Sequence, residues 1–456
     1  MNIWLHFIAI GGSAMHNLAL ALAEKGYTIT GSDDVIFEPS RSRLARKGLL
    51  PEREGWFPEK LDPNIDAVIL GMHAKADNPE LLRAKELGLK IYSYPEYLYE
   101  QSKDKMRIVI GGSHGKTTIT AMVLHAFRQA GIDTDYMVGA RLEGFDVMVK
   151  LSHNAHFMVI EGDEYLTSPI DPRPKFHLYH PHIALLSGIA WDHFNVFPSF
   201  EIYRKQFEIF VSLIEPAGAL VYCKEDESVR RIASNAPNNI QKISYSFPEF
   251  KIQDHTTLIK AIDEWFPLQI FGKHNLLNLS GAMKVCQLIG IDTLTFMKAM
   301  TSFRGASNRL ELIAQNELTA VYRDFAHSPS KVKATIEALV GQYPERNLVA
   351  CLELHTFSSL NKDFLPQYKG SMEMAHKRII YFNPHSLQLK NLPPLFADEI
   401  KKSFDDDSLQ VFNDIDALLA FLETLSWKNS NLLLMSSGNF DGLDSKRLAD
   451  KILKHS

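Results

Sequence analysis

Short apolar runs alternate with longer amphipathic segments along almost the whole chain. Short runs rich in valine, isoleucine and leucine predict buried strands, and the segments between them predict helices. The predicted strands cover residues 3–10, 27–30, 67–70, 91–93, 108–110, 157–160, 183–186, 320–322, 348–352, 378–382 and 432–435. Strands that alternate with helices in this way favour parallel sheets, so we predict an α/β fold throughout.

Polar stretches divide this pattern into three parts. A charged segment at 101–105 precedes one apolar run, and a glycine-containing polar segment at 303–309 precedes another. Such segments are typical of domain boundaries and hinges, and 456 residues are enough for about three domains. We therefore predict domains at 1–104, 105–308 and 309–456.

The strand predicted at 108–110 runs into a glycine-rich loop that ends on a lysine and two threonines, followed by a helix at 119–130. Backbone N–H groups of such a loop can face an anion, and the helix points its positive end at the same place. Lys116 suits the β- and γ-phosphates of a nucleotide, and Thr117 suits a magnesium ion. The predicted ATP-binding residues of the loop are Gly112, Ser113, His114, Gly115, Lys116, Thr117 and Thr118.

This loop is a compact variant of the usual phosphate motif, G-x-x-x-x-G-K-[ST]. Ile110 occupies the place of the first glycine, and three residues separate Gly111 from Gly115. An ordinary strand–helix turn with a chance lysine is the alternative. The order of strand, glycines, Lys-Thr pair and helix favours phosphate binding.

The first predicted strand is followed by a second glycine turn, a helix at 15–25, another strand and then Asp33. This order is the βαβ plan of nucleotide-binding folds, in which an acid about 20 residues past the glycines holds a ribose hydroxyl. Ala14 and Met15 stand where the dinucleotide signature expects another glycine. A nicotinamide dinucleotide is therefore not the obvious ligand, and a uridine diphosphate suits the turn equally well.

Ionisable residues follow two later strands. Acids at 161–164 come directly after one strand, and Asp192 and His193 come shortly after the next. Ligands bind at the carboxyl ends of parallel strands, so a phosphate loop with Glu161 and His193 predicts metal-assisted phosphoryl transfer. Taken singly, the acids could form a solvated turn and the histidine could be structural.

Two asparagines, Asn275 and Asn278, lie three residues apart in a helix predicted to end near residue 289. On a helix both amides face one side, where they can recognise a purine edge. Taken alone, they are better explained as a helix cap followed by a surface asparagine.

Composition narrows the class of protein. A net charge of −5 argues against a nucleic-acid-binding surface. The three scattered cysteines form no CxxC pair, which fits a reducing cytoplasm rather than a disulfide framework or a zinc site. The first apolar run lacks the basic region of a signal peptide, and no run reaches membrane-spanning length. We therefore expect a cytoplasmic protein that binds neither nucleic acid nor membrane.

Taken together, a set of motifs resembles those of the Mur ligases of peptidoglycan synthesis, over nearly the whole chain. The motifs are 111–118, 161–164, Asp192-His193, 272–278, Arg309 and 324–329. The resemblance implies an N-terminal Rossmann-like UDP-binding domain, a central P-loop ATPase-like domain and a C-terminal Rossmann-like α/β domain that binds the acceptor. Folylpolyglutamate synthetases share the central core but lack a UDP-binding domain, so they match poorly.

Within the family, two segments resemble the murein peptide ligases. The acidic motif continues as in their E-A-D-E-Y…D-x-R-x-K-F…Y-x-P segment, and residues 435–442 resemble their M-S-N-G-G-F-G-G sequence. The first segment comprises 161–165, Asp171, Arg173, Lys175, Phe176, Tyr179 and Pro181. The implied reaction joins the lactyl carboxylate of UDP-N-acetylmuramate to the amino group of L-Ala-γ-D-Glu-meso-diaminopimelate through an acyl phosphate, in peptidoglycan recycling. The alternative within the family is the ligase that adds free L-alanine in de novo synthesis.

The resemblance also implies a role for each matching residue. Lys116 contacts the transferred phosphate, while Thr117 and Glu161 hold magnesium. His193 supports a second magnesium ion. The other implied ATP contacts are Asn275, Asn278, Arg309 and Asp324, and the implied UDP-sugar contacts are Gly11, Gly12, Ser13, Ala14, Met15, Ser32, Asp33 and His73.

Two regions depart from the family. Several Mur ligases carry a carbamylated lysine after the Asp-His pair, but here Phe207 stands near the expected place. We therefore do not predict that Lys205 is carbamylated. Residues 353–359 match the acceptor-contacting sequence of neither ligase type, which leaves the acceptor open.

Three functions outside this family remain alternatives at this point. A small-molecule kinase would use the same phosphate loop, and a nicotinamide-dependent dehydrogenase would rest on the N-terminal βαβ unit alone. A non-catalytic nucleotide-binding switch would leave Glu161 and His193 unexplained.

Overall fold

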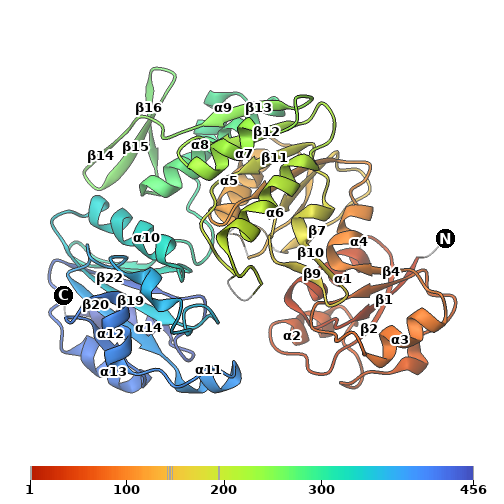
Figure 1. Cartoon of the computed structure of the whole chain (residues 1–456). Helices are drawn as coiled ribbons and strands as arrows, with labels where there is room; N and C mark the ends of the chain where they lie inside the picture. Colours follow the sequence, from red (N-terminus) through yellow and green to blue (C-terminus); the bar gives the residue numbers. More distant parts are fainter. Residues whose placement is uncertain (1–2, 141, 143–144, 146, 194–195, 455–456) are drawn as a thin grey trace. The chain divides into compact units, whose positions relative to one another are not determined.

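The computed structural model describes residues 3–140, 142, 145, 147–193 and 196–454 (Figure 1). The chain forms two compact units, one of residues 1–189, 204–245 and 284–289, and the other of residues 190–203, 246–283 and 290–456. Parallel sheets with intervening helices occur in both units, which confirms the predicted fold class. The three predicted domain boundaries stay predictions. Among the described residues, no helix is long and apolar enough to cross a membrane.

The first unit begins with a four-stranded sheet of order β2-β1-β3-β4, in which every pair is parallel. Its elements are β1 (Trp4–Ile8), α1 (Ser13–Glu24), β2 (Thr28–Ser32), α2 (Ser40–Arg46), β3 (Ala67–Leu70), α3 (Pro79–Glu86), β4 (Ile91–Ser93) and α4 (Tyr94–Glu100). Because all strands run in one direction, the glycine turn after β1, Asp33 after β2 and the start of α4 share the carboxyl edge of the sheet.

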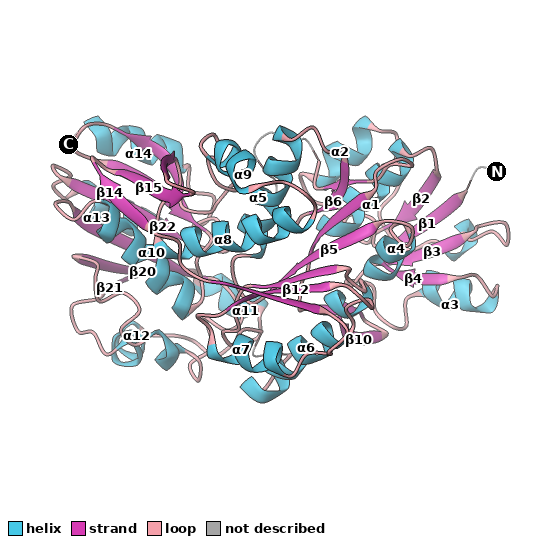
Figure 2. Ribbon diagram, turned by 90° about the horizontal axis from the view of Figure 1, so that it is seen from above, coloured by secondary structure: helices cyan, strands magenta, loops and turns pink. Residues whose placement is uncertain are grey.

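The same unit contains a seven-stranded sheet of order β13-β12-β11-β5-β8-β6-β7. Its strands are β5 (Met106–Gly111), β6 (Thr134–Met137), β7 (Val149–Lys150), β8 (Phe157–Glu161), β11 (Ile183–Leu186), β12 (Ala219–Cys223) and β13 (Gln241–Tyr245). Helix α5 (Lys116–Gln129) covers one face and α7 (Glu227–Ser234) the other (Figure 2). Strand β5 lies between β8 and β11 and is parallel to both, so the loop after β5 has the ends of those two strands as neighbours.

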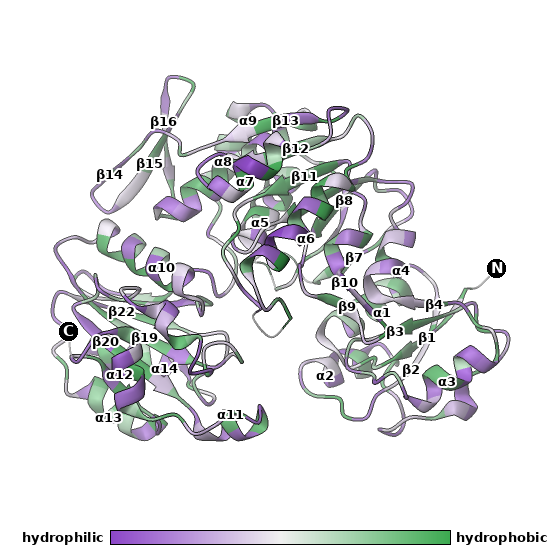
Figure 3. Ribbon diagram, viewed as in Figure 1, coloured by the Kyte–Doolittle hydropathy of each residue, from purple (hydrophilic) through white to green (hydrophobic). Residues whose placement is uncertain are grey.

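The central strands are buried on both faces, which explains why their sequences are continuous apolar runs. Ile108, Val109 and Ile110 of β5 have no exposed surface, and the same is true of Met158, Val159 and Ile160 in β8. In Figure 3, strands of this sheet such as β8 and β11 carry the hydrophobic colour, whereas helices such as α6 and α7 include hydrophilic residues. Buried parallel strands have this pattern because helices cover both faces of the sheet.

A short hairpin, absent from the sequence predictions, follows β8. It consists of β9 (Leu166–Ser168) and β10 (Asp171–Pro174), and it leads into the 3₁₀ turn η2 (Lys175–Leu178). The hairpin and η2 pack against α4, and Arg173 lies 3.5 Å from Glu96. This hairpin therefore connects the acidic motif after β8 with the carboxyl edge of the N-terminal sheet.

The second unit contains a six-stranded sheet of order β17-β18-β22-β19-β20-β21 and a three-stranded antiparallel sheet of order β14-β15-β16. The strands are β14 (Phe250–Gln253), β15 (Thr256–Ala261), β16 (Glu264–Leu268), β17 (Glu311–Gln315), β18 (Ala320–Asp324), β19 (Asn347–Leu354), β20 (Lys377–Phe382), β21 (Gln410–Phe412) and β22 (Ser430–Met435). Its helices include α9 (Thr293–Met300), α10 (Pro329–Gln342), α11 (Pro384–Leu389), α12 (Ala397–Phe404), α13 (Ile415–Glu423) and α14 (Ser445–Lys454). Helices α6 (Phe200–Ser212) and α8 (Lys273–Leu288) contain residues of both units.

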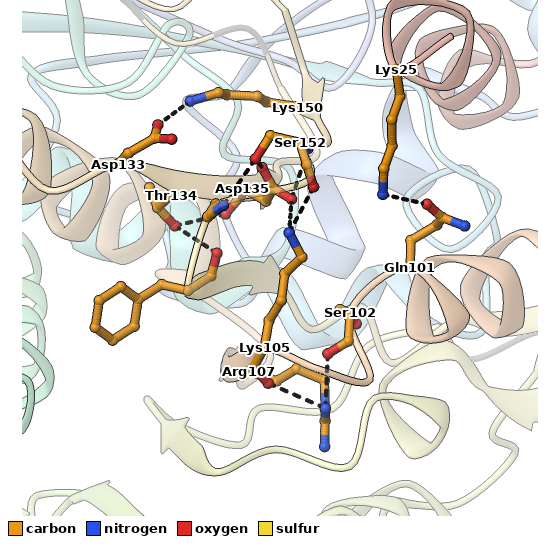
Figure 4. A network of polar contacts seen from close by, with 12 residues as sticks. Lys25, Gln101, Ser102, Lys105, Arg107, Asp133, Thr134, Asp135, Lys150 and Ser152 are labelled. Atoms are coloured by element: carbon orange, nitrogen blue, oxygen red, sulfur yellow. Dashed lines mark hydrogen bonds and ion pairs between the residues drawn. The ribbon is translucent and has the colours of Figure 1, made fainter. Parts of the chain in front are cut away.

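A polar network fixes the connection between the two sheets of the first unit (Figure 4). The ammonium of Lys105 lies 2.7 Å from a carboxylate oxygen of Asp135, and these side chains are 2% and 0% exposed. Lys105 also donates to the carbonyl of Ser152 at 2.8 Å. The predicted boundary at 101–105 is thus held by a buried ion pair.

Candidate active site

The phosphate loop depends on two glycines with left-handed backbone. Gly112 has a φ of +129° and Gly115, the N-cap of α5, has a φ of +79°. A Cβ atom on Gly112 would lie 2.1 Å from the hydroxyl oxygen of Ser187. The N–H of Ser113 donates to the carbonyl of Gly188 at 2.9 Å. The residues after β11 therefore support the loop.

The ammonium of Lys116 lies between a carboxylate and the loop itself. Its nitrogen is 2.6 Å from a carboxylate oxygen of Glu164 and 2.6 Å from the carbonyl of Gly112. Burial alone would lower the pKa of Lys116, but the carboxylates of Glu164, Asp163 and Glu161 raise that pKa above its ordinary value. Lys116 therefore stays positively charged where the sequence predicts phosphate.

Glu161 is held by the loop on one side and by a backbone amide on the other. Its carboxylate accepts hydrogen bonds of 2.7 Å from the hydroxyl of Thr117 and 2.7 Å from the N–H of Gly139. Both Thr117 and Glu161 are buried. Hydroxyl and carboxylate oxygens are the ligands that magnesium prefers, so this pair fits the predicted ion. No sequence motif marks Gly139.

Replacing Gly139 by alanine is expected to raise the magnesium concentration for half-maximal activity by about 10-fold or more. A Cβ atom there would lie 3.1 Å from a carboxylate oxygen of Glu161, so the carboxylate must move. The measurement is ADP formation during a magnesium titration. Gly341→Ala is the control, because Gly341 lies in α10 with open space around its Cβ position. An unchanged magnesium requirement in Gly139→Ala would contradict the role given to Glu161.

Asp163 also takes a lysine partner. Its carboxylate lies 2.6 Å from the ammonium of Lys175 in η2. Nearby, the phenol of Tyr179 is fully buried, and among the described residues its hydroxyl has no hydrogen-bond partner. Burial, with the adjacent Tyr94 and Asp163, holds the pKa of Tyr179 well above its ordinary value. The three acids of the motif thus have different partners: Glu161 accepts from Thr117, Asp163 pairs with Lys175, and Glu164 pairs with Lys116.

The predicted UDP-sugar residues gather at the carboxyl edge of the N-terminal sheet. The N–H of Gly11 donates to the carboxylate of Asp33 at 2.7 Å, which ties the glycine turn to the end of β2. Burial raises the pKa of Asp33 to about 6. The remaining predicted residues follow β1, end β2 or follow β3; they are Gly12, Ser13, Ala14, Met15, Ser32 and His73. Their contacts to a ligand stay predictions.

Four predicted ATP contacts lie in the second unit. Asn275 lies in the first turn of α8 and donates to the carbonyl of Phe271 at 2.9 Å, so it is not an N-cap, whose side chain would accept a backbone N–H. Asn278 is 7% exposed, so the surface-asparagine alternative is wrong. The carboxylate of Asp324 accepts hydrogen bonds of 2.5 Å from the N–H of Leu310 and 2.6 Å from the N–H of Ala326. Burial raises the pKa of Asp324, and the charge of neighbouring Arg309 opposes that rise.

Asp192 and His193 also belong to the second unit. The carboxylate of Asp192 lies 3.2 Å from the ammonium of Lys331 in α10 and accepts the N–H of His193 at 2.8 Å. Burial would raise the pKa of Asp192, but the charges of Lys331 and His193 hold it well below its usual range. The role of His193 as a magnesium ligand stays a prediction.

Phe207, near the place where the resemblance expects a carbamylated lysine, lies in the core. The ring is fully buried and meets the ring of Phe176 edge-on at 5.4 Å. Phe210, one turn on, stacks on the same ring at 4.7 Å. This part of α6 is therefore aromatic core.

The fold and this geometry define a class: an α/β protein with a glycine-rich loop of phosphate-binding type, an acidic strand end and a separate N-terminal βαβ sheet. Two family models match the chain, the Mur ligase middle domain over residues 110–286 and the Mur ligase family, catalytic domain over residues 5–106. A UDP-N-acetylmuramate–L-alanine ligase of Clostridium acetobutylicum is 30% identical over 390 residues, which are 81% of this chain and 82% of that protein. The chain belongs to the Mur ligase family.

Solved structures agree with this fold. A murein peptide ligase from Psychrobacter arcticus is 24% identical, covers 99% of both chains and has a TM-score of 0.66. A UDP-N-acetylmuramate-alanine ligase from Thermotoga maritima is 18% identical, covers 100% of both chains and has a TM-score of 0.72. Membership of this family makes the protein an ATP-dependent ligase that forms a C–N bond. This finding argues against the kinase, dehydrogenase and non-catalytic alternatives.

Proposed function

We propose that this ligase joins the lactyl carboxylate of UDP-N-acetylmuramate to the amino group of L-Ala-γ-D-Glu-meso-diaminopimelate, giving ADP and phosphate, in peptidoglycan recycling. One observation carries the ATP-dependent half of this proposal. Acids at the end of β8 hold two side chains of the phosphate loop, Thr117 through Glu161 and Lys116 through Glu164. The names of the relatives support UDP-N-acetylmuramate as the acyl donor.

The first half of the reaction activates the carboxylate, which is otherwise a poor acyl donor at neutral pH. A carboxylate oxygen forms a bond to the γ-phosphorus of ATP, the bond from that phosphorus to the β–γ bridging oxygen breaks, and ADP leaves. Lys116 and the N-terminus of α5 neutralise the charge that spreads over the phosphoryl oxygens. Thr117 and Glu161 would hold a magnesium ion, which supplies Lewis-acid stabilisation of the phosphates. We also propose that His193 would hold a second magnesium ion.

The second half forms the amide. The acceptor amine attacks the carbonyl carbon of the acyl phosphate and forms a tetrahedral intermediate. The carbon–oxygen bond to phosphate then breaks, the nitrogen loses a proton, and phosphate leaves. Exclusion of water between the two steps protects the acyl phosphate from hydrolysis.

The choice of acceptor rests on the segment that follows the acidic motif. The hairpin β9–β10 and η2 carry the residues that resemble the murein peptide ligases. The curated relatives near 30% identity carry the name of L-alanine ligases, which favours the second candidate, addition of free L-alanine to UDP-N-acetylmuramate. The two candidates share the donor and differ only in the amine.

Phosphate release with ATP and UDP-N-acetylmuramate is expected to be faster with the tripeptide than with free L-alanine, by at least about 100-fold in kcat/KM. A site built for several polar groups of the acceptor rejects an amine that lacks them. UDP-N-acetylglucosamine is the control donor, because it has no lactyl carboxylate to activate. A preference for free L-alanine would overturn the choice of acceptor.

A further inference from the structure

A second lysine lies at the acidic motif, beside Asp163. The ammonium of Lys175 is 2.6 Å from the carboxylate of Asp163, and its side chain is 22% exposed. The next residue, Glu164, holds Lys116 at the same distance, 2.6 Å. Two consecutive carboxylates therefore position two lysines, one from the phosphate loop and one from η2.

The backbone around Lys175 is fixed on two sides. The N–H of Lys175 donates to the carbonyl of Tyr165 at 2.9 Å, and the N–H of Phe176 donates to the carbonyl of Asp163 at 3.1 Å. The ring of Phe176 is fully buried and stacks on Phe210. The lysine thus extends from a rigid part of the unit, so its ammonium is preorganised.

Lys175 also lies on the segment that joins the two substrate-binding regions of the first unit. Residues of β9, β10 and η2 pack against α4, with Arg173 3.5 Å from Glu96. Helix α4 begins at the carboxyl edge of the N-terminal sheet, the edge that carries Asp33. The segment of β9, β10 and η2 follows the acidic motif in sequence, and that motif contacts the phosphate loop.

The proposed reaction needs a cation where the carboxylate of the acyl donor approaches ATP. A substrate carboxylate must approach the terminal phosphate of ATP, and both groups are negatively charged. Lys116 is held at the loop by the carbonyl of Gly112, where the nucleotide is predicted to bind. The ammonium of Lys175, held by the adjacent carboxylate of Asp163, can pair with the incoming carboxylate, because a charge-assisted hydrogen bond is stronger than a neutral one.

We propose that Lys175 binds the carboxylate of the acyl donor and neutralises the acyl phosphate formed from it, with Asp163 as its positioning residue. This inference rests on the proposed function. Lys175 pairs with the carboxylate before attack on the γ-phosphorus, and with the acyl phosphate after ADP leaves.

The test uses the full chain with ATP, UDP-N-acetylmuramate and hydroxylamine in place of the acceptor. Hydroxylamine attacks the carbonyl carbon of the acyl phosphate, releasing phosphate and leaving a hydroxamate, which reports the first half of the reaction. Lys175→Met is expected to lower hydroxamate formation about 10- to 100-fold, mainly by raising the KM for UDP-N-acetylmuramate, with ATP affinity unchanged. Lys175→Arg keeps the charge and is expected to recover part of the loss.

Lys150→Met is the matched control, because Lys150 pairs with Asp133 at an exposed position of the same unit. It is expected to behave as the wild type. Equal KM values in Lys175→Met and Lys150→Met, or a parallel loss of ATP affinity in Lys175→Met, would overturn the inference. A wild type that forms no hydroxamate would overturn the proposed function itself, and the inference with it.

Discussion

Replacing Lys116 by alanine is expected to reduce ADP formation by about 1,000-fold or more, while binding of UDP-N-acetylmuramate stays nearly intact. Lys116 is the cation held at the mouth of the phosphate loop, 2.6 Å from both Glu164 and the carbonyl of Gly112. Removal of one charged group that stabilises a transferring phosphoryl group costs a factor of this order. The predicted donor site lies instead around Gly11 and Asp33, in a different sheet. The measurements are coupled ADP release and calorimetric binding of the UDP-sugar.

The Lys116→Ala variant needs a control for folding, because it removes the lysine countercharge of a buried carboxylate. Glu164 is 1% exposed, and loss of the countercharge of a buried carboxylate is strongly destabilising. The double variant Lys116→Ala/Glu164→Gln removes that charge and is expected to restore the thermal midpoint, but not the activity. Equal loss of ADP release and UDP-sugar binding in a folded double variant would contradict the separation of the two sites.

The sequence predicted the parts of the site that depend on strand ends. The order of apolar runs gave β5 and β8, and their parallel pairing aligns Ile110 with Glu161. The glycines, the lysine and the acids each follow a strand directly, so the sequence shows them as local signals. A parallel sheet then brings these strand ends to one edge. The contact of Glu161 with Thr117 follows from that arrangement.

The sequence could not predict the supports that come from distant segments. Gly139 and Ser187 lie in no motif, yet one donates to Glu161 and the other packs against Gly112. Their roles arise from backbone positions that only the folded sheet defines. The hairpin β9–β10 was missed for a different reason: its strands are too short and polar for an alternating pattern to be recognised.

The pairing of acids with lysines also lay beyond the sequence. Glu164 and Asp163 are adjacent, and nothing in their order says which lysine each one holds. The structure assigns Lys116 to Glu164 and Lys175 to Asp163. Asp163 and Lys175, to which the resemblance assigns no role, thereby gain a specific chemical hypothesis.

Replacing Lys105 by methionine is expected to destabilise the connection between the two sheets of the first unit by about 3–5 kcal/mol. The change leaves the carboxylate of Asp135 buried at 0% exposure without its countercharge. Hydrogen bonds from the N–H of Ser152 at 2.9 Å and its hydroxyl at 2.8 Å remain, but they do not neutralise the charge. Because a chain of several domains need not unfold in one step, the measurement is native-state hydrogen exchange of the β6 amides.

Lys150→Met provides the comparison within the same network (Figure 4). Its pair with Asp133 is exposed, with the two side chains 40% and 64% accessible, and such pairs contribute only about 0–1 kcal/mol. The double variant Lys105→Met/Asp135→Asn removes the stranded charge and is expected to recover much of the lost protection, because an uncompensated charge costs more than a polar amide. Equal loss of protection in Lys105→Met and Lys150→Met would mean that the buried pair does not hold this connection.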